Sequence, residues 1–262
     1  MRYILWVLCS AMLLYCYTAN AALYGKRYCK QPGYHCITVK RNQTWHSLWP
    51  NAEERDIVMR LNRLNITYLY PGMTLAVPDD LANSHLMQLA PLPLHLDTTE
   101  KLVIFDPREL AWGAYDDEGY LVRWGPASGG ANWCKDIESE CRTHSGEFRA
   151  YSLGSSRCFS SKFPLPDGGA PMPYCIFFNG GQAFHGEPNG VLGYNASHGC
   201  IRTFVNDAEW LRYNFIEGPS ERNNFRGTKI IVLPYEARKV SAENNNEVVS
   251  SPYATETAIE MR

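Results

Sequence analysis

Nine cysteines constrain this chain more than any other feature of its sequence. Two of them, Cys9 and Cys16, lie in an apolar stretch at residues 4–17, which follows an arginine and ends in small residues. This arrangement is typical of a cleaved secretory signal, so we expect residues 1–21 to be removed and the remainder to fold in an oxidising compartment. An uncleaved membrane anchor is one alternative. A lipoprotein cut before Cys16 is less favoured, because the preceding residue is a tyrosine.

The other seven cysteines are an odd number, so one thiol is expected to stay unpaired. Neighbours in sequence are the expected partners, because closing a short loop loses little chain entropy, although spacing does not prove connectivity. The expected pairs are Cys29–Cys36, Cys134–Cys141 and Cys158–Cys175. Cys200 is then the free thiol, and a free thiol in a secreted protein suggests chemistry. No spacing is CxxC, which argues against a structural zinc site.

The composition excludes several classes of protein. Hydrophobic residues make up 45% and charged residues 20%, a globular balance. The formal net charge of -2 argues against an electrostatic nucleic-acid binder. The length of 262 residues suits one medium domain and one small one.

After an N-terminal segment at 22–35, residues 36–80 are expected to form a small α+β unit. A strand is expected near 37–40, and Asn51 can cap a helix in a capping box with Glu54. The segment after Pro71-Gly72 ends the unit with a second strand.

Three stretches of this unit, "TVKRNQTWHSLWP", "RLNRLN" and "YPGMTLAVP", resemble a LysM domain. The first turn departs from the usual Gly-Asp-Thr, with Asn42-Gln43-Thr44 in its place. The resemblance implies binding to the N-acetylglucosamine backbone of peptidoglycan or chitin. A structural cap that binds no glycan is the alternative.

Residues 81–100 form a proline-containing connector that is expected to pack along the next domain. Residues 101–235 then read as mainly β. Strands are expected near 102–105, 110–115, 120–124, 147–151, 175–178, 182–185 and 228–233. One amphipathic helix is expected at about 206–215, and residues 236–262 read as a disordered tail.

The segment Ala196-Ser197-His198-Gly199-Cys200-Ile201-Arg202 is expected to lie at the start of that helix. A cysteine near a helix N-terminus has a lowered pKa, and the free N–H groups there suit a developing oxyanion. His185 ends an expected strand and can meet Cys200 in space. The two side chains would then form a pair for acyl transfer.

"FHG" followed by "SHGCIR" resembles the L,D-transpeptidase catalytic domain of YkuD type, over about residues 102–234. The resemblance implies a β-sandwich-like fold with a helix after the nucleophile. It implies Cys200 as nucleophile and His185 as general base. The residues expected to shape the site or its oxyanion hole are His198, Gly199 and Arg202, and those expected to bind substrate are Ser197, Gly186 and Tyr194. The cysteine pairs at 134/141 and 158/175 are expected to brace a lid.

The resemblance further implies a periplasmic or cell-wall enzyme that acts on peptidoglycan stems and needs no metal or organic cofactor. Cys200 would cleave the diaminopimelate–D-Ala bond of a tetrapeptide stem and pass the acyl group to an amine. Water or an outer-membrane protein could replace that amine, and an inactive wall-binding module is a further alternative. Two further alternatives remain for the site. His198 could act as the base, and His185, His198 and Cys200 could together bind a metal ion. The sequence leaves the oligomeric state open.

Overall fold

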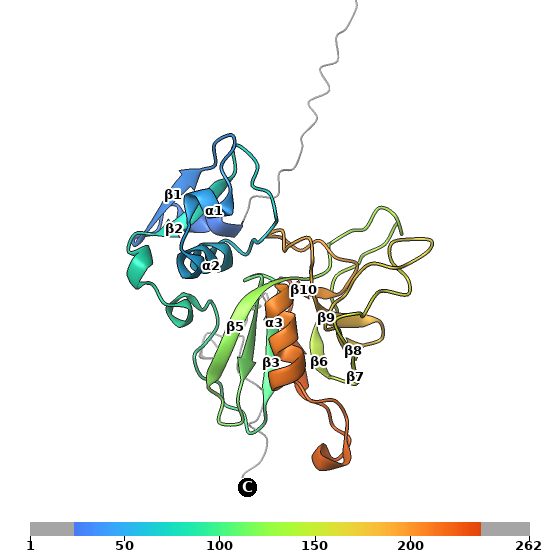
Figure 1. The fold of residues 1–262 in the computed structure, drawn as a ribbon. Helices are drawn as coiled ribbons and strands as arrows, with labels where there is room; N and C mark the ends of the chain where they lie inside the picture. Colours follow the sequence, from blue (N-terminus) through green and yellow to red (C-terminus); the bar gives the residue numbers. More distant parts are fainter. Residues whose placement is uncertain (1–23, 237–262) are drawn as a thin grey trace, which may run out of the picture.

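The computed structural model describes residues 24–236, which form two packed domains (Figure 1). The expected signal at 1–21 and nearly all of the expected tail lie outside this range. We call residues 24–83 the N-terminal domain and residues 100–236 the C-terminal domain. No helix within 24–236 is long and apolar enough to cross a bilayer.

The N-terminal domain has the expected strand–helix–helix–strand order. Its elements are the 3-10 helix η1 (Tyr24–Tyr28), β1 (Tyr34–Thr38), α1 (Trp45–Leu48), α2 (Ala52–Leu61) and β2 (Thr74–Pro78). Strands β1 and β2 pair antiparallel, and both helices pack on an apolar core that includes Trp45, Val58 and Leu75. Asn51 caps α2 as expected, since its Oδ1 accepts from the N–H groups of Glu53 and Glu54.

The connector carries two short 3-10 helices, η2 (Leu81–Asn83) and η3 (Leu86–Leu89). Leu92 and Leu96 are buried against one face of the C-terminal sheet, in a cluster with Leu102 and Ile104. The expectation that the connector packs along the next domain is therefore confirmed.

The C-terminal domain is built on one nine-stranded sheet in the order β6-β11-β3-β4-β5-β10-β9-β8-β7. The strands are β3 (Leu102–Asp106), β4 (Ala111–Tyr115), β5 (Leu121–Ser128), β6 (Gly146–Arg149), β7 (Ser152–Leu153), β8 (Ile176–Asn179), β9 (Gln182–Gly186), β10 (Ile201–Thr203) and β11 (Lys229–Val232). Seven of them match the expected strands, whereas β7 and β10 were not expected.

The sheet curls over its own core. Phe105 of β3 meets Phe184 of β9 edge to face, with ring centroids 6.4 Å apart, and Phe148 of β6 packs on Phe178 of β8. The expected helix is α3 (Val205–Trp210), which continues as a π-helical turn, η4 (Leu211–Phe215), before the 3-10 turn η5 (Glu221–Asn223). Its buried face contributes to the same core. The expectation of a mainly β domain with few helices is confirmed, and its strands form a single curled sheet.

All three expected disulfides are present, and Cys200 is the free cysteine among residues 24–236. Cys29–Cys36 ties η1 to β1. Residues 154–175 connect β7 to β8, and we call them the 154–175 loop. Cys158–Cys175 closes most of this loop.

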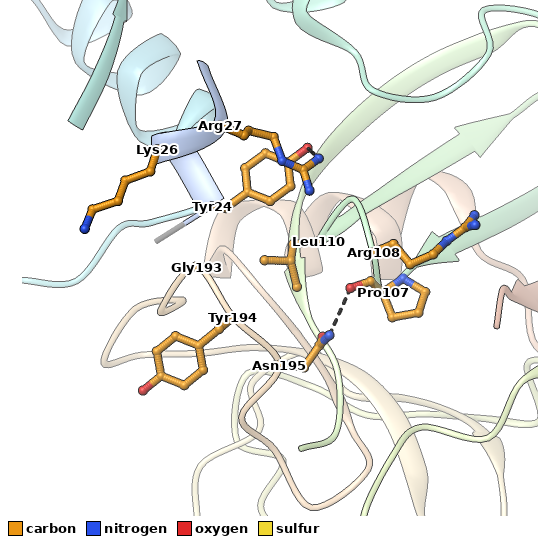
Figure 2. Close-up of a pocket in the computed structure, with 9 residues that line it drawn as sticks. All are labelled: Tyr24, Lys26, Arg27, Pro107, Arg108, Leu110, Gly193, Tyr194 and Asn195. Carbon is orange, nitrogen blue, oxygen red and sulfur yellow. Dashed lines mark hydrogen bonds between the residues drawn. The ribbon is translucent and has the colours of Figure 1, made fainter. Parts of the chain in front are cut away.

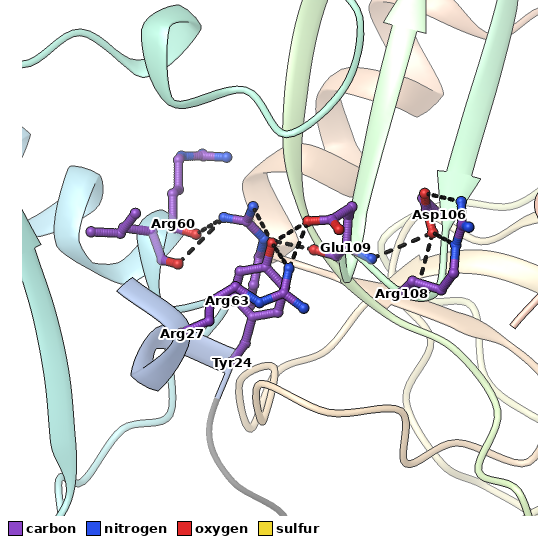
Figure 3. A network of polar contacts seen from close by, with 8 residues as sticks. Tyr24, Arg27, Arg60, Arg63, Asp106, Arg108 and Glu109 are labelled. Atoms are coloured by element: carbon purple, nitrogen blue, oxygen red, sulfur yellow. Dashed lines mark hydrogen bonds and ion pairs between the residues drawn. The ribbon is translucent and has the colours of Figure 1, made fainter. Parts of the chain in front are cut away.

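Polar contacts join the two domains (Figure 3). The buried side chain of Arg63 donates from Nε to the backbone carbonyl of Glu109 at 3.0 Å, and the Glu109 carboxylate accepts from Arg27 and Tyr24. Arg60 at the end of α2 forms a two-pronged ion pair with Asp207 of α3, at 2.8 and 3.0 Å. The N-terminal domain is thus fixed to the C-terminal one.

Candidate active site

The two residues with the strongest expected chemistry lie on neighbouring strands. Strand β10 pairs in parallel with β9, and Arg202 lies directly opposite His185. Cys200 comes two residues before Arg202, and alternate residues of a strand share a face of the sheet. This register places Cys200, Arg202 and His185 on one face. The positive charge of Arg202 accordingly acts on the pKa values of both His185 and Cys200.

This arrangement corrects one expectation. Cys200 does not stand at a helix N-terminus, because the strand β10 separates it from α3, which begins at Val205. A helix dipole acts strongly only within the first turn, so it does not activate this thiol. The pairing of β9 with β10 places Cys200 next to the strand that carries His185 instead.

His185 is buried, and a backbone carbonyl fixes its ring. Nδ1 lies 2.8 Å from the carbonyl oxygen of Gly186, so Nδ1 carries the proton and Nε2 has the free lone pair. The pKa of His185 is lowered to about 4, mainly by burial and in part by the Arg202 charge, with the Gly186 contact acting in the opposite direction. The imidazole is therefore neutral at neutral pH and able to accept a proton.

Cys200 is half-buried near the turn between β8 and β9, where it packs against an apolar cluster that includes Met172, Cys175 and Ala183. Its Sγ lies 3.7 Å from the carbonyl oxygen of Gly181. Burial raises the pKa of the thiol, and the N–H of Ala183 together with the Arg202 charge opposes that effect. The resting pair is a neutral thiol beside a neutral imidazole, with groups in place to stabilise a thiolate.

A tight turn at residues 197–199 presents Cys200. The Ser197 hydroxyl accepts from the N–H of Gly199 at 3.0 Å and donates to the Cys200 carbonyl. Gly199 has φ +116°, and a Cβ there would lie 2.8 Å from the Gln182 amide nitrogen, so the turn requires glycine.

His198, the other imidazole of the segment, is turned toward a carboxylate. Its Nε2 lies 2.8 and 2.9 Å from the two oxygens of Asp136, and its ring stacks on Phe163 of the 154–175 loop at 4.2 Å. These contacts favour His185 over His198 as the base. They also hold the 154–175 loop beside the site.

Within residues 24–236, one group of three side chains brings metal-ligating atoms together: Cys134, Asp136 and His198. Cys134 is bonded to Cys141, so it offers no thiolate in this state. The sequence also left open a metal site formed by His185, His198 and Cys200. Within residues 24–236 the ligand atoms of these three side chains do not come together.

Arg202 pairs with Glu187, whose carboxylate oxygen lies 3.2 Å from its Nε. Glu187 follows the His185-Gly186 pair directly, so this ion pair ties the end of β9 to β10. Arg202 is therefore oriented within the site, as a site-shaping residue would be.

The three residues expected to bind substrate occupy different surroundings. The Gly186 carbonyl holds the His185 ring, and Ser197 is buried inside the turn. Tyr194 is 39% exposed and lines a pocket of about 370 Å³ at the domain junction (Figure 2). The lining of that pocket includes Tyr24 and Arg108 but neither His185 nor Cys200.

The family model for the YkuD L,D-transpeptidase catalytic domain matches residues 100–232, just over half of the 262 residues. The chain belongs to this family. No curated protein sequence matches it significantly.

Several solved L,D-transpeptidase structures are similar to this chain. One from Xylanimonas cellulosilytica is 25% identical, covering 63% of this chain and 73% of its own, with a TM-score of 0.45. One from Stackebrandtia nassauensis is 16% identical, covering 58% and 62%, with a TM-score of 0.41. One from Mycobacterium smegmatis is 19% identical, covering 76% and 91%, with a TM-score of 0.39.

Sequence reasoning missed several contacts of this YkuD domain. Asp136 and Phe163, the partners of His198, carry no local signal, because nothing in their own segments points to position 198. Glu187 stands immediately after the His185-Gly186 pair. Its negative charge, opposite to that of Arg202, is the signal that could have identified it as the partner of Arg202.

Proposed function

We propose that this chain is a peptidoglycan L,D-transpeptidase of the periplasm or cell wall, with Cys200 as nucleophile and His185 as general base. The family match over 100–232, which spans both residues, carries the proposal. The register of β9 and β10 supports it, since it puts both side chains on one face of the sheet.

In the acylation step, Nε2 of His185 takes the thiol proton as Sγ of Cys200 attacks the carbonyl carbon between diaminopimelate and D-Ala. The C–N bond then breaks, and the proton passes from His185 to the departing amine of D-Ala. A thioester on Cys200 remains. In the second step His185 takes a proton from the amine of another stem, which attacks the thioester. The C–S bond then breaks, the proton returns from His185 to the Cys200 thiolate, and the cross-link is complete.

The neutral resting pair suits this sequence of steps. Burial keeps the thiol protonated until a substrate carbonyl arrives, and the N–H of Ala183 and the Arg202 charge then stabilise the forming thiolate. The Gly199 N–H already donates to the Ser197 hydroxyl. We therefore assign the other two N–H groups of the expected oxyanion hole, those of His198 and Cys200, to bind the oxyanion.

We propose that the N-terminal domain is LysM-like and binds the glycan strands. Tyr68 and Tyr70 are exposed apolar surfaces in the loop before β2 and would stack on sugar rings. Such binding would raise the local concentration of stems at the catalytic site.

The test is mass spectrometry of the products formed from purified disaccharide-tetrapeptide. A cross-linked dimer that has lost D-Ala, absent with Cys200→Ala, supports transpeptidation. Tripeptide alone indicates that water is the acceptor, and an added outer-membrane protein tests the anchoring reaction. No product, with the Cys200 thiol confirmed free, favours the wall-binding module. Loss of product in His198→Ala but not in His185→Ala would overturn the assignment of the base.

A further inference from the structure

The segment between the two proposed catalytic residues does not pack only on its own domain. After His185 in β9 the chain runs through residues 187–199 before it reaches Cys200. We call residues 187–195 the connecting loop. Its middle crosses to the N-terminal domain, where Leu192 pairs with Leu64 in an isolated β-bridge and packs against that domain's apolar core.

Asn65, just beyond the end of α2, makes the polar part of this contact. Its backbone N–H donates to the carbonyl of Val191 at 3.2 Å, and its side-chain Oδ1 accepts from the N–H of Val191 at 2.7 Å. Gly190 fits beside it with φ +89°, and a Cβ there would lie 2.5 Å from the Asn65 carbonyl oxygen. A backbone hydrogen bond, the Asn65 side chain and the close fit of Gly190 therefore hold the connecting loop against the N-terminal domain.

The same part of the N-terminal domain also holds the chain after Cys200. Arg60 lies five residues before Asn65, and its guanidinium pairs with the fully buried carboxylate of Asp207 in α3. The segment that carries Cys200 is thus anchored on one side at Val191 and on the other at Asp207. Both anchors are bound by residues of the last turn of α2 and the four residues that follow it.

We propose that the N-terminal domain is a positioning element of the catalytic site, with Asn65 as the positioning residue for the connecting loop. The inference rests on the proposed function for its effect on catalysis. Asn65 touches neither reacting group, and it acts by restricting where the turn at 197–199 presents the thiol relative to His185. Small displacements of reacting groups have large effects on rate, so a change in this domain alters turnover and not only wall binding.

The experiment compares three variants of the full chain. Asn65→Ala removes the Oδ1 acceptor, and Asn65→Asp keeps an oxygen acceptor at the same place. Asn51→Ala is the matched control, because it removes the cap of α2 in the same domain and, within residues 24–236, its side chain bonds only to Glu53 and Glu54 of that helix.

Asn65→Ala is expected to lower kcat on disaccharide-tetrapeptide about tenfold with KM within about twofold, which is less than the roughly hundredfold that a 1 Å misplacement of reacting groups can cost. Asn65→Asp should recover most of the rate, and Asn51→Ala should keep it despite a comparable fall in Tm. Hydrogen exchange of the 187–199 amides should speed up in Asn65→Ala alone.

Equal kcat in Asn65→Ala and Asn51→Ala, or unchanged exchange in 187–199, would overturn the positioning role. The exchange readout needs no turnover, so it tests the positioning role even if the wild-type chain forms no product. Absence of product in the wild type would count against the proposed function instead.

Discussion

The protonation state of His185 makes stability depend on pH in a defined way. In the folded chain burial lowers the pKa of this imidazole to about 4, whereas an unfolded histidine titrates near 6.5. Between these values the unfolded chain binds more protons than the folded chain. The free energy of unfolding must therefore rise as pH rises from about 4 to 6.5, and this contribution is complete above that range.

The size follows from the two pKa values. The full difference corresponds to about 3 kcal/mol, of which about 2 kcal/mol develops between pH 7 and pH 5. His185→Asn removes the titration but keeps an amide N–H that can donate to the Gly186 carbonyl. Other ionisable groups contribute equally to both proteins, so the difference between wild type and variant isolates His185.

Urea unfolding of both proteins at pH steps from 4.5 to 7.5, with the disulfides intact, measures this difference. The wild type should lose about 2 kcal/mol more than His185→Asn on going from pH 7 to pH 5. Parallel stability curves would refute a buried, neutral His185. The same pKa predicts that kcat/KM shows no acid limb near pH 6.5, because the base stays unprotonated down to about pH 4.

Three further changes test other parts of the structure. Arg60→Ala leaves a buried carboxylate with a single arginine partner and should cost about 3 kcal/mol of unfolding free energy in urea titrations, whereas a loss below about 1 kcal/mol would contradict the buried ion pair. Replacing Cys158 and Cys175 by serine opens a loop with a sequence separation of 17 and should lower stability by about 3 kcal/mol, and an unchanged unfolding midpoint would count against it. Tyr68→Ser with Tyr70→Ser should weaken sacculus binding severalfold without moving Tm, and equal binding would remove these rings from the glycan surface.

Local signals predicted most of the elements of this fold. Alternating apolar residues, Gly-containing turns and the Asn51 cap each act over a few residues, so they can be read directly from the sequence. The disulfides could be paired because each loop is short and the chain was expected to be secreted. The paired His-Gly and Ser-His-Gly-Cys segments likewise identified Cys200 and His185 before any geometry was known.

The errors arise where structure depends on distant partners. Strand β10 is three residues long, too short for alternation to show, and it exists because β5 and β9 bond to it on either side. Its absence from the prediction placed Cys200 at a helix start. The Arg60–Asp207 pair joins residues far apart in sequence, so the role of the N-terminal domain beside the site also required the structure.

Whether Cys200 carries the acyl group is tested most directly by peptide mass spectrometry of the protein trapped during its reaction. The protein is mixed with disaccharide-tetrapeptide, quenched in acid within the first turnover and digested. We expect an adduct equal to the substrate minus D-Ala on the peptide that contains Cys200, and none on Cys200→Ala. Release of D-Ala with no adduct on this peptide, or an adduct on another residue, would contradict it.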